Sequence, residues 1–153
     1  MRVAIALGAN LNDRLQTIQK AFSALQGDFL ENARLSSVYE TKPWGGIPQP
    51  DFMNAVVVGE TEWKAPAIVN YLKTLEKDLG RRSRERNGPR EIDLDLLLIE
   101  DQVYEGPGVS VPHPGIADRS FVLNPLKELW PEWVHPKLGL SVNEMLKRLN
   151  SAG

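Results

Sequence analysis

The sequence contains no cysteine among its 153 residues. This absence excludes disulfide bonds, thiolate catalysis and cysteine-ligated zinc, and it is compatible with a reducing cytoplasm. Long apolar runs are also missing, since no stretch approaches the ~20 residues that a membrane-spanning helix needs. The short apolar run after Met1 leads directly to Asn10, Asn12 and Asp13, so we interpret it as a first strand and not as a signal peptide. We therefore expect a cytoplasmic protein.

An excess of positive charge is absent as well. The net charge is -2, with 25% charged and 42% hydrophobic residues, which is ordinary for a soluble globular protein and argues against a basic nucleic-acid binder. The length suits one domain that buries roughly two-thirds of its unfolded surface. We assign residues 1–153 to that single domain, and we expect a monomer without a nucleic-acid or membrane partner.

Hydrophobic spacing along the chain predicts an alternation of strands and helices. We expect strands near the amino terminus and over 34–41, 52–60 and 91–99, and helices between Asp13 and Gly27, from Pro66 to Gly80, around Pro125 and after Ser141. The last helix begins with an S-x-x-E capping box, and the helix around Pro125 is expected to be interrupted there. This order predicts an α+β, ferredoxin-like fold whose mostly antiparallel sheet carries the helices packed on one face.

Asp93 and Asp95 stand one residue apart in the apolar run IDLDLLL. Alternate side chains of a strand share a face, so we expect both carboxylates on one face, with their Cα atoms about 7 Å apart. The opposite face then holds Leu94, Leu96 and Leu98. Two converging carboxylates suit Mg²⁺, which takes its other oxygens from water and phosphates. A solvated acidic face is the structural alternative.

Five arginines lie within residues 81–90, directly before this strand. Guanidinium groups bind phosphate bidentately and stay charged at any relevant pH. The Gly88-Pro89 pair is expected to fix Arg90 beside the carboxylates, although a solvated loop is the alternative for the cluster as a whole. The chain has neither GxxxxGK[ST] nor GxGxxG, so any nucleotide must be held by side chains. Arginines and carboxylates together are what phosphoryl transfer from a nucleotide requires.

Two further segments are candidates for ligand contacts. The segment from Thr41 to Asn54 contains Trp44 and Phe52, which offer aromatic faces to a flat heteroaromatic ligand, and Asn54 offers an amide for its edge. These aromatic residues can equally cover the edge of the core. His113 lies between two prolines and suits either a phosphate contact or a structural turn, whereas we assign His135 to a surface turn.

The stretch GPREIDLDLLL resembles the signature of the hydroxymethyl-dihydropterin pyrophosphokinases, a family of folate-pathway enzymes. The stretches ALGANL, YETKPWGGIPQPDFMNAV and VPHPGIADRSFVLNPLKEL resemble other segments of that family in the same order, so the resemblance covers about residues 1–150. It implies a ferredoxin-like fold and transfer of diphosphate from ATP to the hydroxymethyl group of 6-hydroxymethyl-7,8-dihydropterin, with release of AMP. It also implies two Mg²⁺ ions and ATP as co-substrate.

The resemblance implies a role for each matching residue. The catalytic residues are expected to be Arg81, Arg90, Asp93 and Asp95, and the metal ligands are Asp93 and Asp95. The ATP-binding residues are expected to be Glu76, Arg81, Arg90, Leu96, Ser110, His113 and Arg119. The pterin-binding residues are expected to be Thr41, Pro43, Trp44, Phe52, Asn54, Asp95 and Phe121, with Phe52 and Phe121 sandwiching the ring.

This chain departs from the family pattern in the arginine-rich loop. Asn87 stands where many members have a tryptophan, and Ser83 stands at the position of the second loop arginine, whose role falls to Arg82 or Arg84. We expect the loop 81–90 to move on binding. The alternative to the enzyme is a non-catalytic domain that binds RNA or another polyanion through the arginines. The net negative charge and the lack of a second basic patch argue against that alternative.

Overall fold

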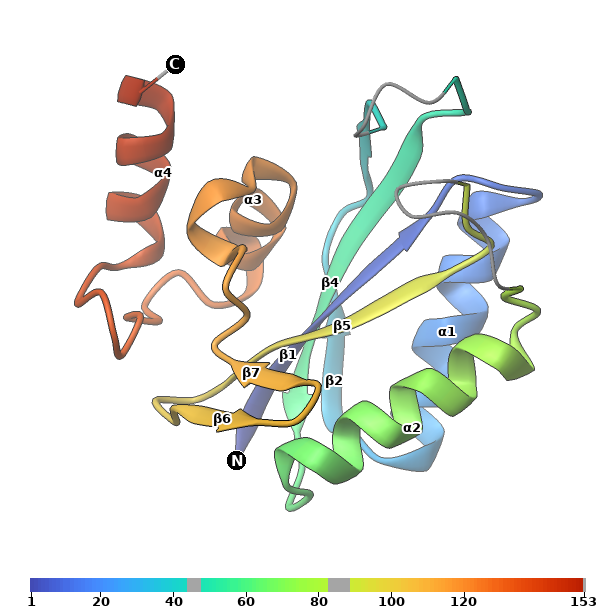
Figure 1. Ribbon diagram of the computed structural model, residues 1–153, viewed down its shortest axis with the longest axis horizontal. Helices are drawn as coiled ribbons and strands as arrows, with labels where there is room; N and C mark the ends of the chain where they lie inside the picture. Colours follow the sequence, from blue (N-terminus) through green and yellow to red (C-terminus); the bar gives the residue numbers. More distant parts are fainter. Residues whose placement is uncertain (44–47, 83–88, 153) are drawn as a thin grey trace.

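The computed structural model describes residues 1–43, 48–82 and 89–152, and Figure 1 shows their arrangement. The elements in chain order are β1 (Arg2–Ala9), α1 (Arg14–Asp28), β2 (Glu31–Leu35), β3 (Tyr39–Thr41), β4 (Phe52–Glu60), α2 (Ala65–Asp78), β5 (Asp93–Ile99), β6 (Tyr104–Gly106), β7 (Val109–Val111), a 3-10 turn (Ile116–Asp118), α3 (Ser120–Leu129) and α4 (Val142–Ala152). No helix in these described ranges is long and apolar enough to cross a membrane.

The main sheet has the strand order β2-β4-β1-β5, and β3 pairs with β4 beside β2. All of these pairs are antiparallel. The strands β6 and β7 form a separate hairpin. This arrangement confirms the predicted α+β, ferredoxin-like class with a mostly antiparallel sheet. Strand β5 lies at one edge of the sheet, so its free side is available to other parts of the chain.

Helices cover both faces of the sheet, and the prediction that they share one face was wrong. Val3, Ile5 and Leu7 of β1 pack with α1 and α2 in one cluster of buried residues, whereas Ala4 packs with α3 and α4 in a second. Figure 1 shows α1 and α2 on one side of the sheet and α3 and α4 on the other. The physical reason is that β1 and β4 are apolar on both faces, so each face needs its own cover.

The predicted strand 34–41 is two strands. β2 ends at Leu35, and the Ser36 hydroxyl takes part in the contacts with β4: it accepts a hydrogen bond from the Val56 backbone N–H and donates to the Ser37 carbonyl, both at 2.9 Å. Side-chain hydroxyls that bond nearby backbone groups compete with regular ladder pairing. The chain resumes pairing with β4 at Tyr39.

A β-bulge interrupts the alternation of β5. Ala4 of β1 pairs with Leu98 and the next residue, Ile5, pairs with Leu96, so Leu97 is an extra residue in the ladder. Leu97 and Leu98 consequently belong to the same buried cluster, on the α3 and α4 face, and the prediction that Leu98 shares a face with Leu94 was wrong. A bulge places two consecutive residues opposite one partner, which strict alternation does not anticipate.

The helix ends follow the sequence closely. The Asp13 side chain caps α1 by accepting from the Gln16 N–H at 3.1 Å, and Ser141 and Glu144 form the predicted capping box at the start of α4. Helix α3 continues through the buried Pro125, so the predicted interruption is wrong. His135 lies at the predicted turn, where its Nδ1 accepts the backbone N–H groups of residues 137 and 138. The side chain is buried, however, and not at the surface as predicted.

Candidate active site

Two cavities meet at the aspartates of β5. The first encloses about 540 Å³ on the α3 face of the sheet, and the second encloses about 570 Å³ between α2, the free edge of β5 and the β6–β7 hairpin. Asp93 and Asp95 line both cavities. They are therefore placed to act on groups that reach them from either side.

Strands β1 and β4 form the floor of the first cavity. Ala6 and Gly8 pair with Asp95 and Asp93, and these small residues leave space above the sheet. On the other side of Gly8 lies Asn54, whose Nδ2 donates to the Thr41 hydroxyl at 2.6 Å. A Cβ on Gly8 would come within 3.2 Å of the Asn54 Oδ1, so glycine leaves room for this amide. The Asn54 amide is thus held in place on the cavity floor, with one of its two N–H groups bonded to Thr41.

Most of the residues expected to bind pterin lie in this first cavity. Its lining includes Thr41, Phe52, Asn54, Asp95 and Phe121, together with Arg90 and Arg119, which were expected at ATP. Pro43 is not among the lining residues, and Trp44 lies outside the described residues. The cavity also contains Lys42, Leu97 and Asp118, which were not assigned from the sequence. The only feature of the sequence that could have pointed to these three residues is that each stands next to an assigned residue.

Arg119 lies across a glycine on the rim of the first cavity. A Cβ on Gly115 would approach the Arg119 Nε to 2.8 Å, so any other residue at position 115 would require the guanidinium to move. The Arg119 guanidinium carbon is 5.9 Å from the centre of the Phe121 ring. Glycine at position 115 therefore leaves room for the guanidinium near the Phe121 ring, whose π-face attracts a cation.

The second cavity gathers the remaining residues expected to bind ATP. Its lining includes Glu76, Arg81, Leu96, Ser110 and His113. The Ser110 hydroxyl is engaged by the Glu105 carboxylate, with oxygen–oxygen distances of 2.8 and 2.9 Å. Glu105 also lines the cavity and was not assigned from the sequence, where nothing distinguished it from other surface acids.

His113 presents one defined nitrogen to the second cavity. Its Nδ1 accepts the Gly115 N–H at 3.0 Å, which leaves Nε2 as the protonated nitrogen of the neutral ring. Its own backbone N–H donates to the Leu97 carbonyl at 2.7 Å. Burial first, and then the charge of Arg119, lower the pKa of His113. The imidazole is thus a neutral hydrogen-bond donor near neutral pH.

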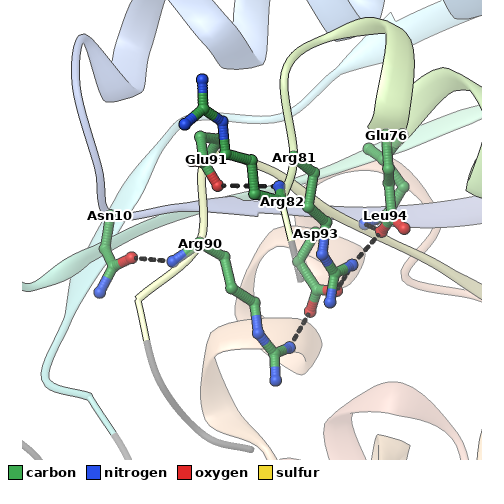
Figure 2. A network of polar contacts seen from close by, with 8 residues as sticks. All are labelled: Asn10, Glu76, Arg81, Arg82, Arg90, Glu91, Asp93 and Leu94. Carbon is green, nitrogen blue, oxygen red and sulfur yellow. Dashed lines mark hydrogen bonds and ion pairs between the residues drawn. The ribbon is translucent and has the colours of Figure 1, made fainter. Parts of the chain in front are cut away.

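Asp93 is held between two arginines. The Arg81 guanidinium contacts one carboxylate oxygen at 3.1 Å, and the Arg90 guanidinium contacts the other at 3.2 Å (Figure 2). All of these side chains are about one-quarter exposed. The two guanidinium groups supply the positive charge that a carboxylate at this position requires, and they stand where an anionic ligand can also reach them.

Glu76 supports this arrangement from α2. One of its oxygens accepts the Leu94 N–H and the Arg81 guanidinium, both at 2.7 Å. The Glu76 side chain is only 11% exposed, and burial is the largest cause of its raised pKa. Glu76 lines the second cavity as expected, but its visible contacts hold the edge of β5 and orient Arg81.

Asp95 has a different environment. Among the described residues no donor bonds to its carboxylate, while burial, and then the charges of Asp93 and Glu76, raise its pKa to about 7. A half-buried carboxylate without a donor is stabilised by a cation. Asp95 beside Asp93 is a donor set of hard oxygens that fits Mg²⁺, with its remaining positions left to water and phosphate.

Some predictions concern residues that the structure does not describe. Ser83, Arg84 and Asn87 lie outside the described residues, as does Trp44. Arg82 is described, and its backbone N–H lies 3.5 Å from a Glu91 oxygen. The exposed Arg82 side chain is not among the residues that line either cavity. The choice between Arg82 and Arg84 as the second loop arginine therefore stays a prediction.

Carboxylates that can hold a metal, next to arginines that can contact phosphate, are parts that recur in enzymes of phosphoryl transfer. Comparison with known proteins agrees. Residues 4–131 match the family model described as 7,8-dihydro-6-hydroxymethylpterin-pyrophosphokinase. The chain belongs to that family, as the resemblance in the sequence predicted.

Individual relatives differ in length. The chain is 40% identical over 134 residues to a 2-amino-4-hydroxy-6-hydroxymethyldihydropteridine pyrophosphokinase of Aquifex aeolicus, covering 88% of this chain and 83% of that protein. It is 38% identical over 152 residues to the folic acid synthesis protein fol1 of Schizosaccharomyces pombe, covering 97% of this chain but 20% of that protein.

A solved structure shares the fold. The crystal structure of Plasmodium falciparum HPPK-DHPS wild type superposes with a TM-score of 0.74 at 14% identity. The match covers 98% of this chain and 45% of that one. At this identity the similarity supports the fold alone, and it extends over nearly the whole chain.

Proposed function

We propose that this chain catalyses the reaction of its family, the transfer of diphosphate from ATP to the hydroxymethyl group of 6-hydroxymethyl-7,8-dihydropterin, in a Mg²⁺-dependent step of folate biosynthesis. The observation that carries this assignment is the meeting of two cavities at Asp93 and Asp95, with arginines on the approach to the pair. One cavity suits a flat heteroaromatic ring, and the other suits a polyphosphate.

The first cavity is proposed to bind the pterin. Phe52 and Phe121 offer ring faces, and the Asn54 amide retains a carbonyl and one N–H for the heterocycle edge, since its other N–H is used by Thr41. The small residues Ala6 and Gly8 leave room for a flat ring over the sheet. Thr41, Pro43 and Trp44 complete the proposed binding set.

The second cavity is proposed to bind ATP. Arg81 and His113 face it with a guanidinium and a neutral Nε2–H, both of which donate hydrogen bonds to phosphate oxygens. Leu96 and Ser110 line the same space, and Glu76 orients Arg81. Arg90 and Arg119 line the pterin side, next to the aspartates, where they can reach the transferred group.

Asp93 and Asp95 would hold Mg²⁺, in two ions by the family pattern. The bound metal supplies charge neutralisation on the attacking and leaving oxygens. With a metal bound, Asp93 would no longer depend on its two arginine partners, and Arg81 and Arg90 would be available to bind phosphate oxygens. Asp95 gains the cation that its desolvated carboxylate lacks.

The protein chiefly supplies positioning and charge. The pterin hydroxyl oxygen attacks the β-phosphorus of ATP and a new P–O bond forms. The bond from that phosphorus to the oxygen shared with the α-phosphate breaks, AMP leaves, and the hydroxyl proton passes to solvent. The aromatic walls and the Asn54 amide hold the pterin so that its hydroxymethyl group points toward the Asp93–Asp95 pair.

One assay tests this function directly. The protein is incubated with ATP, Mg²⁺ and 6-hydroxymethyl-7,8-dihydropterin, and nucleotide products are separated by chromatography. AMP and the pterin diphosphate are expected in equal amounts, and removal of Mg²⁺ with EDTA should stop their formation. Release of ADP in place of AMP, or undiminished turnover in EDTA, contradicts the proposal.

We also propose that residues 1–153 act as one domain and as a monomer in the cytoplasm, where ATP is available. Sedimentation velocity of the active protein checks the oligomeric state, since a monomer has a mass of 17.1 kDa. A polyanion-binding role predicts instead binding that is indifferent to Mg²⁺ and strongly weakened by salt.

A further inference from the structure

Asn10 is a buried polar residue between the two loops that lead into the site. It follows β1 directly and is only 1% exposed. Its position is outside the lining of either cavity, so substrate contact does not explain it. Its hydrogen-bond partners in the described part of the chain belong to two segments far apart in sequence, residues 49–50 and Arg90.

The backbone of Arg90 is bound to Asn10 at both of its polar groups. The Arg90 N–H donates to the Asn10 Oδ1 at 2.8 Å (Figure 2), and the Asn10 N–H donates to the Arg90 carbonyl at 3.1 Å. Arg90 in turn reaches Asp93 through its guanidinium. Asn10 therefore fixes the backbone of the residue that contacts a proposed metal ligand.

The other end of the amide holds the segment that leads into β4. The Asn10 Nδ2 donates to the Gln49 Oε1 at 2.8 Å and to the Pro50 carbonyl at 2.9 Å. Phe52, on the wall of the pterin cavity, follows two residues after Pro50. Both N–H groups and the oxygen of the Asn10 amide thus form hydrogen bonds. If the amide were flipped, its NH2 group would face the Arg90 N–H, and two donors would be opposed.

We infer that Asn10 is a positioning residue that couples the two substrate sites. This inference rests on the proposed function, because it concerns how the pterin and nucleotide cavities act on each other. One rigid amide links the segment beside Phe52 to the backbone of Arg90, so ordering either segment by its ligand restrains the other. A ligand that meets an already ordered segment loses less conformational entropy on binding, which makes binding of the two substrates cooperative.

The variant Asn10→Asp separates the two links. Its carboxylate still accepts the Arg90 N–H but has no proton for the Pro50 carbonyl, and it places negative charge against that oxygen. The hydrogen bond to the Pro50 carbonyl is therefore lost, whereas the hydrogen bond from the Arg90 N–H is kept. The variant Gln49→Met removes the side-chain oxygen that accepts from the Asn10 Nδ2, at a half-buried position. It replaces Asn10→Asp in the experiment if that variant does not fold.

The experiment measures the dissociation constant of the pterin by calorimetry, with and without Mg²⁺ and the unreactive analogue α,β-methylene-ATP. Couplings between sites typically change an affinity about 5- to 150-fold, and we expect a factor in that range for the unaltered protein. The factor should fall to about 1 in Asn10→Asp, with the reciprocal effect of pterin on the analogue reduced equally. The affinity for each ligand alone should change much less.

The matched control is Thr61→Val. Thr61 is also a buried polar residue, 6% exposed, but its hydroxyl accepts the Trp63 N–H at the opposite end of β4. This variant should keep the coupling factor. The inference is overturned if Asn10→Asp and Gln49→Met retain the factor, if the unaltered protein shows none, or if Thr61→Val loses it equally. Failure of the unaltered protein to form AMP contradicts the proposed function separately.

Discussion

The two cavities are built differently although they share two aspartates. The first rests on the interior strands β1 and β4 and is walled by aromatic rings, with one amide already half-satisfied. The second lies beyond the edge strand β5, between a helix and a short hairpin, and its ion pairs connect Glu76, Arg81 and Asp93. Both cavities carry charged side chains, but among the described residues phenyl rings line only the first, through Phe52 and Phe121.

The two aspartates also differ from each other in their surroundings. Asp93 has both oxygens paired with arginines, whereas Asp95 has no donor among the described residues and a raised pKa. Two carboxylates one residue apart thus contribute differently to the ligand-free protein. Asp93 contributes to its stability, whereas Asp95 lowers it because its charge is desolvated. Substitutions at the two positions should therefore agree in activity and differ in stability.

The largest expected effect is that of Asp95→Asn. Loss of a ligand that contributes several kcal/mol of transition-state stabilisation should lower the rate of AMP formation by about 10²- to 10⁴-fold. The melting temperature of the metal-free variant should stay equal or rise, because a desolvated charge is removed. Asp93→Asn should lose similar activity but melt lower, since two ion pairs are broken. Equal melting shifts for both variants would break the comparison.

Arg81→Met should weaken the nucleotide side alone. Loss of charge-assisted hydrogen bonds to phosphate should raise the dissociation constant of MgATP about 10- to 100-fold. The free energy of unfolding should fall by about 1–3 kcal/mol, because the buried Glu76 loses its charge partner. Calorimetry and urea unfolding measure the two effects. The pterin affinity measured without nucleotide should not change, and Arg148→Met, on the exposed side of α4, should leave all three quantities unchanged.

Phe121→Leu should weaken the pterin side alone. Aromatic stacking contributes about 0.5–1.5 kcal/mol beyond buried area, so the dissociation constant of the pterin should rise about 3- to 10-fold. The affinity for MgATP should stay the same. Phe22→Leu is the matched control, since Phe22 packs on the other face of the sheet and outside both cavities. A change in pterin affinity in the control would remove the distinction between the cavities.

The smallest expected effect concerns pH. The pKa of His113 and that of His135 are both lowered in the folded protein, mainly by burial. Each neutral ring therefore contributes stability that is complete above about pH 6.5 and is lost as the pH falls through the lowered pKa. His113→Gln and His135→Gln should each flatten the fall of melting temperature between pH 7 and 5. Only His113→Gln should also weaken MgATP binding, and an equal effect of both variants on binding contradicts the assignment.

Much of the fold could be predicted because local rules govern it. The capping box at Ser141, the helix start at Asp13 and the strand over 52–60 all follow from short-range spacing. The bulge at Leu97 could not be predicted, because it depends on pairing with β1. The coverage of both sheet faces had a local signal, the apolar residues on both faces of β1 and β4. Periodicity within one segment carries no information about register against a distant strand.

The sequence predicted the kind of ligand that the candidate site suits better than it predicted which residues contact one another. Two aspartates and a run of arginines each have a solvated-surface alternative but together suggest metal and phosphate, and the structure brings Arg81 and Arg90 to Asp93. The roles of Glu76 and Asn10 as supports needed coordinates. Each joins segments far apart in the chain, and an isolated glutamate on a helix or an asparagine after a strand has no distinguishing local pattern.

The extra residue in β5 limits how the length of this strand can vary. Removing Leu97 would leave both aspartates, Leu98 and Ile99 on their present faces and would shorten the strand by about 3.3 Å. The deletion would also remove the carbonyl that holds His113. Loss of a residue at this point would therefore remove a buried leucine of the core as well as the acceptor that the His113 backbone N–H uses.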